Sequence, residues 1–182
     1  HDCSMELSVA ARLIEKGISK EPLPQVWADL GAGKGLFSIA LAGLLPAAST
    51  IYAIDQDASA LKNLRINKPD IVLHKVQGDF TLKSLDLPET DGVLMANSLH
   101  FVDDKLSFIK NLKRILKPSG RLLLIEYDMD KPNPWVPYPI SFARMLILAK
   151  DAGFPEVVKI DKEPSVYNRA NIYAAVLTGN PS

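Results

Sequence analysis

The chain has 182 residues, of which 47% are hydrophobic and 23% are charged, a balance typical of a globular protein with a sizeable core. Its 21 Lys and Arg residues equal its 21 Asp and Glu residues, so the basic excess that neutralises phosphates in most nucleic-acid-binding proteins is missing. We therefore expect no nucleic-acid partner.

The sequence also argues against a membrane or secreted protein. No apolar run approaches the roughly 20 residues that span a bilayer. The first residues show no basic segment followed by an apolar core, so no signal peptide is expected. One cysteine, Cys3, cannot form an internal disulfide or a zinc knuckle. We expect a cytoplasmic protein without a bound metal or a membrane partner, and the sequence leaves its oligomeric state open.

The first part of the chain alternates helical and extended patterns. Apolar residues at a spacing of three to four predict helices, short continuous apolar runs predict strands, and prolines mark the breaks. In chain order these patterns predict a helix over 5–18, a strand over 26–30, a helix over 35–45, a strand over 50–57 and a helix over 59–67.

The second part continues the alternation and then changes. Strands are predicted over 71–80 and 91–101, then a helix over 103–116 that Pro118-Ser119-Gly120 closes. After these come a strand over 121–128, a proline-rich loop over 129–139, a helix over 140–152 capped by Gly153, and strands over 156–162 and 172–178.

These elements predict one α/β domain over residues 1–182, with an N-terminal helix and linker over 1–25 and a ligand-binding core over 26–178. Alternating strands and helices, with continuous apolar strands, predict a doubly wound, mostly parallel sheet with helices on both faces. The last two strands have no helix between them, so they should pair antiparallel. In such sheets a ligand binds beyond the carboxyl ends of the strands.

A glycine-rich turn follows the first strand in "VWADLGAGKGLFSIAL", residues 26–41. Gly31 and Gly33 fit the dinucleotide pattern G-x-G-x-x-G, but Leu36 occupies its third position and Gly35 precedes it. Asp29 stands before the turn, where it would repel a pyrophosphate and attract an ammonium group. These features disfavour an NAD-dependent dehydrogenase and favour a zwitterionic ligand with an amino-acid part.

Two further acids end the next strands. Asp55 lies about 20 residues beyond the glycines, where a carboxylate can accept hydrogen bonds from both hydroxyls of a ribose. Asp79, next to Phe80, can accept from the amino group of an adenine ring that apolar neighbours cover. A site for an ammonium, a ribose and an adenine together describes S-adenosylmethionine.

At this point the sequence resembles the class I S-adenosylmethionine-dependent methyltransferases, as a small member with little beyond the core. The matching segments are "ADLGAGKG", "IYAIDQD", "VQGDF", "DGVLMANSLHFV", "LKRILKPSGRLLLIEYD" and "AGFPEVVKI…IYAAVLTG", in the order of the family across about residues 26–178. The resemblance implies a seven-stranded sheet in the order 3-2-1-4-5-7-6, with the seventh strand antiparallel.

The resemblance also implies roles for ten residues. Asp29 would bind the methionine ammonium, and Gly31, Ala32, Gly33 and Gly35 would let the backbone approach the cofactor. Asp55 would hold the ribose hydroxyls. The remaining positions would contact the adenine (Gln56, Asp79 and the backbone of Phe80) or the methionine end (Asn97).

Residues for the acceptor side are less defined by the sequence. His100 follows the fourth strand and is a candidate general base for a hydroxyl or amine, or else a loop histidine. Tyr127, with Glu126, ends the fifth strand and is a candidate for the acceptor side. Trp135 and Tyr138, in the proline-rich loop, would cover an apolar acceptor or form a hydrophobic lid without selectivity.

The function expected from the sequence is methyl transfer from S-adenosylmethionine, by in-line displacement, to a small-molecule acceptor. The alternatives are methyl transfer to a protein side chain and a cofactor-binding partner subunit without catalysis, because no single residue must be catalytic when the methyl group is already activated. The sequence does not identify the acceptor.

Overall fold

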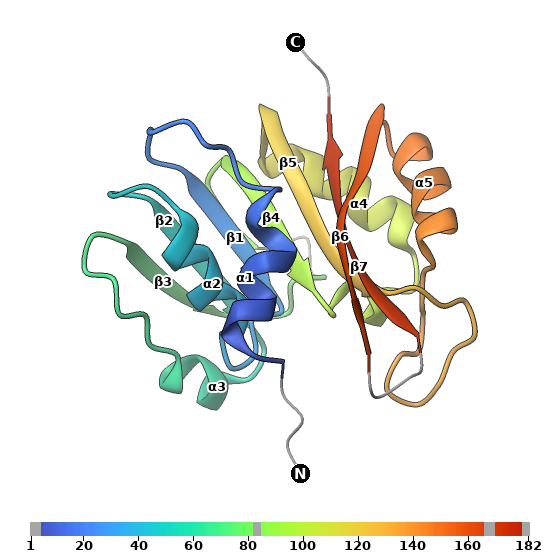
Figure 1. Cartoon of the computed structure of the whole chain (residues 1–182), viewed down its shortest axis with the longest axis horizontal. Helices are drawn as coiled ribbons and strands as arrows, with labels where there is room; N and C mark the ends of the chain where they lie inside the picture. Colours follow the sequence, from blue (N-terminus) through green and yellow to red (C-terminus); the bar gives the residue numbers. More distant parts are fainter. Residues whose placement is uncertain (1–4, 82–84, 166–169, 180–182) are drawn as a thin grey trace.

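Seven strands form one mixed sheet in the order β3-β2-β1-β4-β5-β7-β6 (Figure 1). β7 is antiparallel to both of its neighbours, β5 and β6. This order confirms the fold expected from the sequence. The computed structural model describes residues 5–81, 85–165 and 170–179, and Cys3 lies outside them. The strands are β1 (Val26–Leu30), β2 (Thr50–Asp55), β3 (Val72–Gln77), β4 (Thr90–Ala96), β5 (Leu116–Tyr127), β6 (Glu156–Pro164) and β7 (Asn171–Thr178).

Helices cover both faces of the sheet, as predicted. They are α1 (Leu7–Glu15), α2 (Leu36–Leu44), α3 (Ala58–Asn63), α4 (Lys105–Leu112) and α5 (Phe142–Asp151), with short 3-10 helices η1 (Leu99–Phe101) and η2 (Lys113–Ile115). α1 and α2 pack on one face around the fully buried Trp27. α4 and α5 pack on the other, around Met95 and Leu124.

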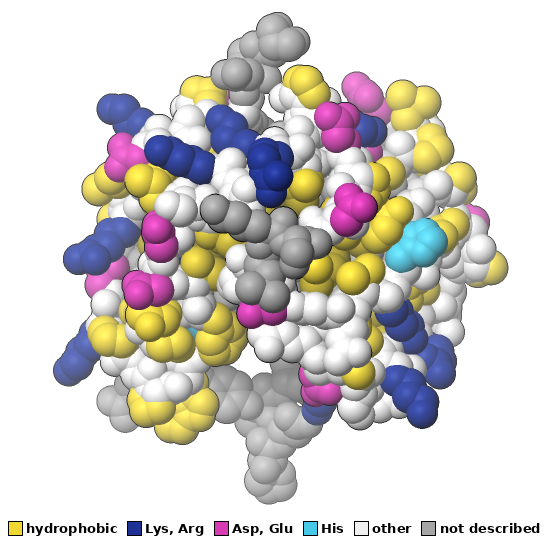
Figure 2. Space-filling view, turned by 180° about the vertical axis from the view of Figure 1, so that it is seen from behind, with side chains coloured by type: hydrophobic (Ala, Val, Ile, Leu, Met, Phe, Trp, Pro, Cys, Tyr) yellow, Lys and Arg dark blue, Asp and Glu magenta, His cyan; other side chains and the backbone are white. Residues whose placement is uncertain are grey.

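One edge of the sheet and the face behind it differ in the elements and side chains that they present. In Figure 1 the parallel strands end at the lower edge, where the loop between β5 and α5 also lies. The face behind carries Lys and Arg, Asp and Glu, and hydrophobic side chains intermixed (Figure 2), in keeping with a net charge of zero. No helix in the described part of the chain is long and apolar enough to cross a bilayer.

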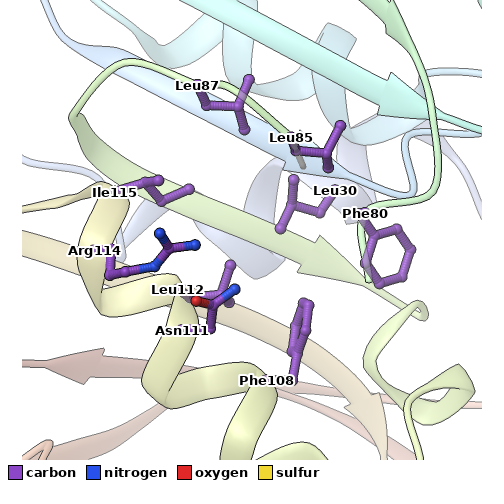
Figure 3. Close-up of a pocket in the computed structure, with 9 residues that line it drawn as sticks. All are labelled: Leu30, Phe80, Leu85, Leu87, Phe108, Asn111, Leu112, Arg114 and Ile115. Carbon is purple, nitrogen blue, oxygen red and sulfur yellow. The ribbon is translucent and has the colours of Figure 1, made fainter. Parts of the chain in front are cut away.

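The connection from β3 to β4 has no helix among its described residues. Instead Phe80, Leu85 and Leu87 point from this connection toward α4 and pack against the core (Figure 3). They enclose a cavity of about 30 Å³ with Phe108 and Leu112 of α4. A volume of this size holds a few water molecules at most, so the cavity cannot hold a nucleoside.

Several element boundaries differ from the sequence prediction. β4 ends at Ala96 and not at 101, because Asn97 has left-handed backbone and 99–101 form η1. β5 begins at Leu116, not 121, and contains the Pro118-Ser119-Gly120 segment that was expected to close a helix. The ladder with β4 shifts there, between Thr90 and Gly92, so Pro118 occupies an irregular stretch that does not require its missing N–H. α3 ends at Asn63 because Leu64 becomes extended and buries its side chain beside Ala53.

Candidate active site

The glycine turn after β1 has a backbone that only glycine adopts easily. Gly31, Gly33 and Gly35 have φ of 79°, 54° and 90°. The amides of Gly31 and Ala32 both donate to the carbonyl of Ile54, at 2.8 and 2.9 Å. A Cβ on Gly31 would lie 2.7 Å from Cβ of Ser98, and one on Gly35 would lie 1.9 Å from Cδ1 of Leu64. The turn is therefore held tightly between β2, α3 and the end of β4.

Asp29 lies on β1, an interior strand of the sheet, and the residue is 1% exposed. Its Oδ2 accepts a hydrogen bond from Ser38 Oγ of α2 at 2.6 Å. Burial raises the pKa of Asp29 to about 6, while the Ser38 hydrogen bond opposes this shift and the charge of Asp55 adds to it. A buried carboxylate with an unfavourable charge is suited to bind a cationic group.

Asp55 has a structural task that the sequence did not show. Its Oδ2 accepts from the amide of Gly33 and its Oδ1 from the amide of Asp57, both at 2.8 Å. Its backbone carbonyl accepts from Gly78, which joins the ends of β2 and β3. The carboxylate thus fixes the glycine turn and the start of α3, and it keeps further lone pairs for other donors.

The residues expected at the adenine end lie beside Asp55. Gln56 is exposed, and its carbonyl accepts from Gln77 Nε2 at 3.3 Å. Asp79 Oδ1 accepts from the amide and the hydroxyl of Thr81, at 2.9 and 2.6 Å. The ring of Phe80 turns inward, with its centroid 5.8 Å from that of Phe108. The backbone of Phe80, and not its ring, is therefore the part that could contact a ligand at the edge of the sheet.

Asn97, directly after β4, has left-handed backbone, with φ of 54°. Its amide donates to the carbonyl of Ile125 at 2.9 Å. Among the described residues, Asn97 Oδ1 is the one buried side-chain oxygen or nitrogen without a hydrogen-bond partner. A buried acceptor of this kind costs stability, and a donor from a bound ligand would satisfy it. The next residue, Ser98, uses its hydroxyl on the carbonyl of Leu30 at 2.8 Å.

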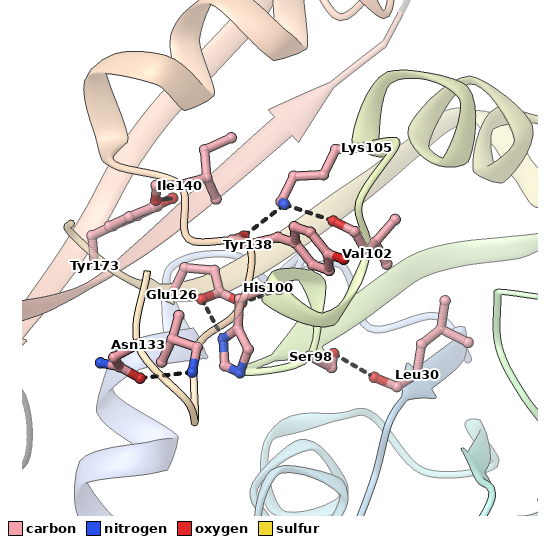
Figure 4. A network of polar contacts seen from close by, with 11 residues as sticks. Leu30, Ser98, His100, Val102, Lys105, Glu126, Asn133, Tyr138, Ile140 and Tyr173 are labelled. Carbon is pink, nitrogen blue, oxygen red and sulfur yellow. Dashed lines mark hydrogen bonds and ion pairs between the residues drawn. The ribbon is translucent and has the colours of Figure 1, made fainter. Parts of the chain in front are cut away.

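His100 and Glu126 form a buried pair at the ends of β4 and β5 (Figure 4). His100 Nδ1 lies 2.8 Å from Glu126 Oε2, and the His100 amide donates to Oε1 at 3.1 Å. Their side chains are 4% and 0% exposed. A carboxylate oxygen is an acceptor, so the ring Nδ1 that faces it is the donor of this contact, and Nε2 faces away from Glu126.

The loop between β5 and α5, residues 128–141, carries the other two acceptor candidates and is fixed at several points. Asp128 and Asp130 accept from the amides of Phe142 and Ser141, at 2.9 and 3.2 Å. Tyr138 donates its amide to the carbonyl of His100 at 3.0 Å. Trp135, in contrast, is 75% exposed.

The structure thus brings most of the residues predicted from the sequence to one edge of the sheet. Tyr127 lies at the end of β5, partly buried, with its ring 6.0 Å from that of His100. Glu126 is fully buried against His100 and does not line an open surface. Sequence reasoning missed Ser38, the pairing of Glu126 with His100, and Lys105, because none of these contacts leaves a pattern in the sequence.

A model of a methyltransferase domain family matches residues 28–124, more than half of the chain. The chain belongs to this family. The match spans the glycine turn, Asp55, Asp79, Asn97 and His100. It confirms the resemblance to S-adenosylmethionine-dependent methyltransferases, and with it the enzyme class and the methyl donor. A search of curated proteins found no match to the sequence.

Several solved structures are similar to this methyltransferase in fold. The YcgJ protein of Bacillus subtilis is 12% identical with a TM-score of 0.72, over 95% of this chain and 99% of the other. The N-terminal domain of EvdMO1, solved with S-adenosylhomocysteine (SAH) bound, is 17% identical with a TM-score of 0.68, over 97% and 82%. The mitomycin 7-O-methyltransferase MmcR is 17% identical with a TM-score of 0.64, over 93% of this chain, which spans about half (53%) of its length.

Proposed function

We propose that this methyltransferase acts on a small-molecule acceptor whose hydroxyl or amine gives its proton to His100. The observation that carries the proposal is the buried pair of His100 and Glu126, which directs the basic nitrogen away from the carboxylate. His100 stands three residues after Asn97, whose buried Oδ1 has no partner. The candidate for the acceptor side, His100, and the candidate for the cofactor side, Asn97, therefore share one turn.

The residues at the edge of the sheet fit S-adenosylmethionine. The buried carboxylate of Asp29 and the unpaired Oδ1 of Asn97 would hold its ammonium group. Asp55 would accept from the ribose hydroxyls, and Asp79 from the adenine amino group. The turn at Gly31, Ala32, Gly33 and Gly35 would let the backbone approach, and Gln56 and Phe80 would flank the adenine. When bound, the cofactor supplies a methyl group on a positively charged sulfur, already activated for displacement.

His100 would act on the proton of the acceptor. A neutral hydroxyl or a protonated amine is a poor nucleophile, and a positioned base that removes its proton contributes typically about 10²- to 10⁴-fold to the rate. Nε2 would take this proton, and the negative charge of Glu126 would stabilise the imidazolium that forms. Both side chains are buried, which strengthens this charge interaction relative to water.

The surroundings of His100 support an apolar or aromatic acceptor of limited size. Phe101, Trp135 and Tyr138 are 57%, 75% and 42% exposed, although large aromatic side chains are usually more buried. The rings of His100 and Phe101 lie 4.4 Å apart, and Tyr138 is bonded to His100 through the backbone. The relative MmcR is named for a small-molecule acceptor, mitomycin.

The proposal is tested with methyl-labelled S-adenosylmethionine and a metabolite extract. We expect label in the small-molecule fraction with the natural protein, and a loss of about 10²-fold or more with His100→Gln. His74→Gln is the matched control, because His74 is an exposed histidine on β3 that stacks on Tyr52, 4.8 Å between ring centroids. It should transfer label at the natural rate.

Each other outcome contradicts a named part of the proposal. Label that moves only into protein would exclude a small-molecule acceptor. Binding of SAH without any transfer would favour a partner subunit without catalysis. An unchanged rate in His100→Gln would remove His100 as the base while leaving the methyl transfer intact.

A further inference from the structure

Lys105, the first residue of α4, joins two segments that are far apart in the sequence. Its Nζ donates to the carbonyl of Val102 at 2.7 Å and to the carbonyl of Tyr138 at 2.6 Å. The ammonium also lies 5.7 Å from the centre of the Tyr138 ring. One side chain therefore binds the turn after β4 and the loop between β5 and α5 at the same time (Figure 4).

The segment that Lys105 holds is the one that contacts His100. Tyr138 donates its amide to the carbonyl of His100 at 3.0 Å, while Lys105 binds the carbonyl of the same Tyr138. Lys105 and Tyr138 thus hold the 99–102 turn at two points, Lys105 at the carbonyl of Val102 and Tyr138 at the carbonyl of His100. Movement of Tyr138 would break the contact with His100 as well as that with Lys105.

Lys105 is half-buried instead of extending freely into solvent, and its ammonium is directed at two backbone carbonyls. Burial lowers the pKa of Lys105, and the charges of Glu126 and Asp103 oppose this shift. A lysine that only covered a helix face would extend its ammonium into water. Here the side chain is half-buried and its ammonium makes two hydrogen bonds to carbonyls of separate loops, and charge-assisted bonds of this kind are stronger than neutral ones.

We propose that Lys105 is a positioning residue that fastens the 128–141 loop to the His100 turn and so fixes the side of the site on which the acceptor would bind. The effect of Lys105 on methyl transfer rests on the proposed function. The attachment of the loop to the turn does not depend on that function. Without this contact, Trp135 and Tyr138 would be held near His100 less firmly, by the remaining anchors of the loop alone. Lys105 touches neither the glycine turn nor the acids of the cofactor side, so cofactor affinity should not depend on it.

Amide hydrogen exchange measures the fastening without an acceptor. The Tyr138 amide, which donates to His100, is the reporter, and the Leu123 amide in the β5–β7 part of the sheet reports global opening. With Lys105→Met we expect exchange at Tyr138 to accelerate about tenfold or more while Leu123 is unchanged. Lys105→Arg, which can still donate to both carbonyls, should restore most of the protection.

Lys113 offers a matched control at another place in the fold. It too donates to a backbone carbonyl, that of Gly153 at 2.8 Å, and lies 4.9 Å from the centre of an aromatic ring, that of Phe154. Lys113→Met removes the same types of contact, made to Gly153 and Phe154 and not to His100 or Tyr138, and should leave exchange at Tyr138 unchanged. SAH affinity, measured by calorimetry, should change by less than about twofold in both variants.

Label transfer to small molecules should then fall in Lys105→Met and recover in Lys105→Arg. Unchanged exchange at Tyr138 in Lys105→Met would overturn the proposal, as would equal acceleration at Tyr138 and Leu123, which would show a general loss of stability. If Lys105→Met does not fold, Lys105→Leu, which also lacks a donor, provides the same comparison. A natural protein that transfers no label would contradict the proposed function, and the exchange result would still decide the fastening.

Discussion

Glu126 binds His100 twice, through the ring Nδ1 at 2.8 Å and through the backbone amide at 3.1 Å. One carboxylate therefore sets the orientation of the imidazole and the position of the turn that carries it. Both oxygens are used as acceptors, so the pair depends on the carboxylate form and not only on the size of the side chain. This makes Glu126 the most informative position for testing the acceptor side.

Glu126→Gln is expected to reduce methyl transfer by about 10²-fold, with SAH affinity unchanged. The amide of Gln keeps one acceptor oxygen but places an NH₂ group opposite the second donor. The imidazole must then accept at Nδ1 and carry its proton on Nε2, which leaves no base. Initial rates with labelled donor, together with calorimetry, check this. A rate within about twofold of the natural one would show that the tautomer of His100 does not matter.

Asp29→Asn is expected to stabilise the protein without ligand at neutral pH. The pKa of Asp29 is raised from 3.8 to about 6, so the folded state holds this proton more tightly than the unfolded state. The contribution of protonated Asp29 to the free energy of unfolding is complete below pH 3.8 and is lost as the pH rises through 6. At pH 7.5 the ionised carboxylate therefore lowers the free energy of unfolding by up to about 3 kcal/mol. Urea unfolding should show a gain of about 1–3 kcal/mol at pH 7.5 and none near pH 3.5. A destabilised variant at pH 7.5 would contradict this.

Binding of SAH is expected to weaken at acidic pH through the same residue. Protonated Asp29 has no charge to offer an ammonium, so affinity should fall about tenfold for each pH unit below 6. Calorimetry between about pH 5 and 8 measures this. Asp29→Asn should bind weakly at every pH, with a flat profile; a variant with natural affinity would remove Asp29 from the ammonium site.

Gly35→Ala is expected to destabilise the protein by about 2 kcal/mol or more, because φ of 90° is unfavourable for alanine and its Cβ would overlap Leu64. Gly43→Ala is the matched control, since Gly43 lies in α2 and a Cβ added there would point into open space. That change should stabilise by about 0.5–1 kcal/mol. Thermal or urea unfolding compares the two, and equal effects would contradict the geometry of the turn.

Most of the fold was predictable because its determinants are local or repeat along the chain. The continuous apolar strand at 26–30, the glycine turn and the acid at Asp55 each carry their meaning within a few residues. The strand order came from the resemblance to a family and is confirmed by the sheet. The cofactor residues were predicted from similar local patterns, and both their identity and their roles stay predictions.

The contacts around His100 were not predictable, because they depend on how distant segments lie side by side. Glu126 lies 26 residues from His100, and Lys105 reaches Tyr138 across 33 residues. The start of β5 was missed for a similar reason. Pro118 and Gly120 indicate a turn locally, but the pairing of β5 with β4 includes them in the strand.

The missing helix in the described part of the β3–β4 connection has a consequence for the cofactor. Asp29 stands on the interior strand β1, Asp55 one strand outward at the end of β2, and Asp79 beyond the edge strand β3, whose residues are exposed or only partly buried. The acids that would bind the methionine end, the ribose and the adenine therefore stand on progressively less protected parts of the protein. Because local opening costs least at such an edge, we expect the spent cofactor to detach at its adenine first, while the reacting end is still held by the centre of the sheet.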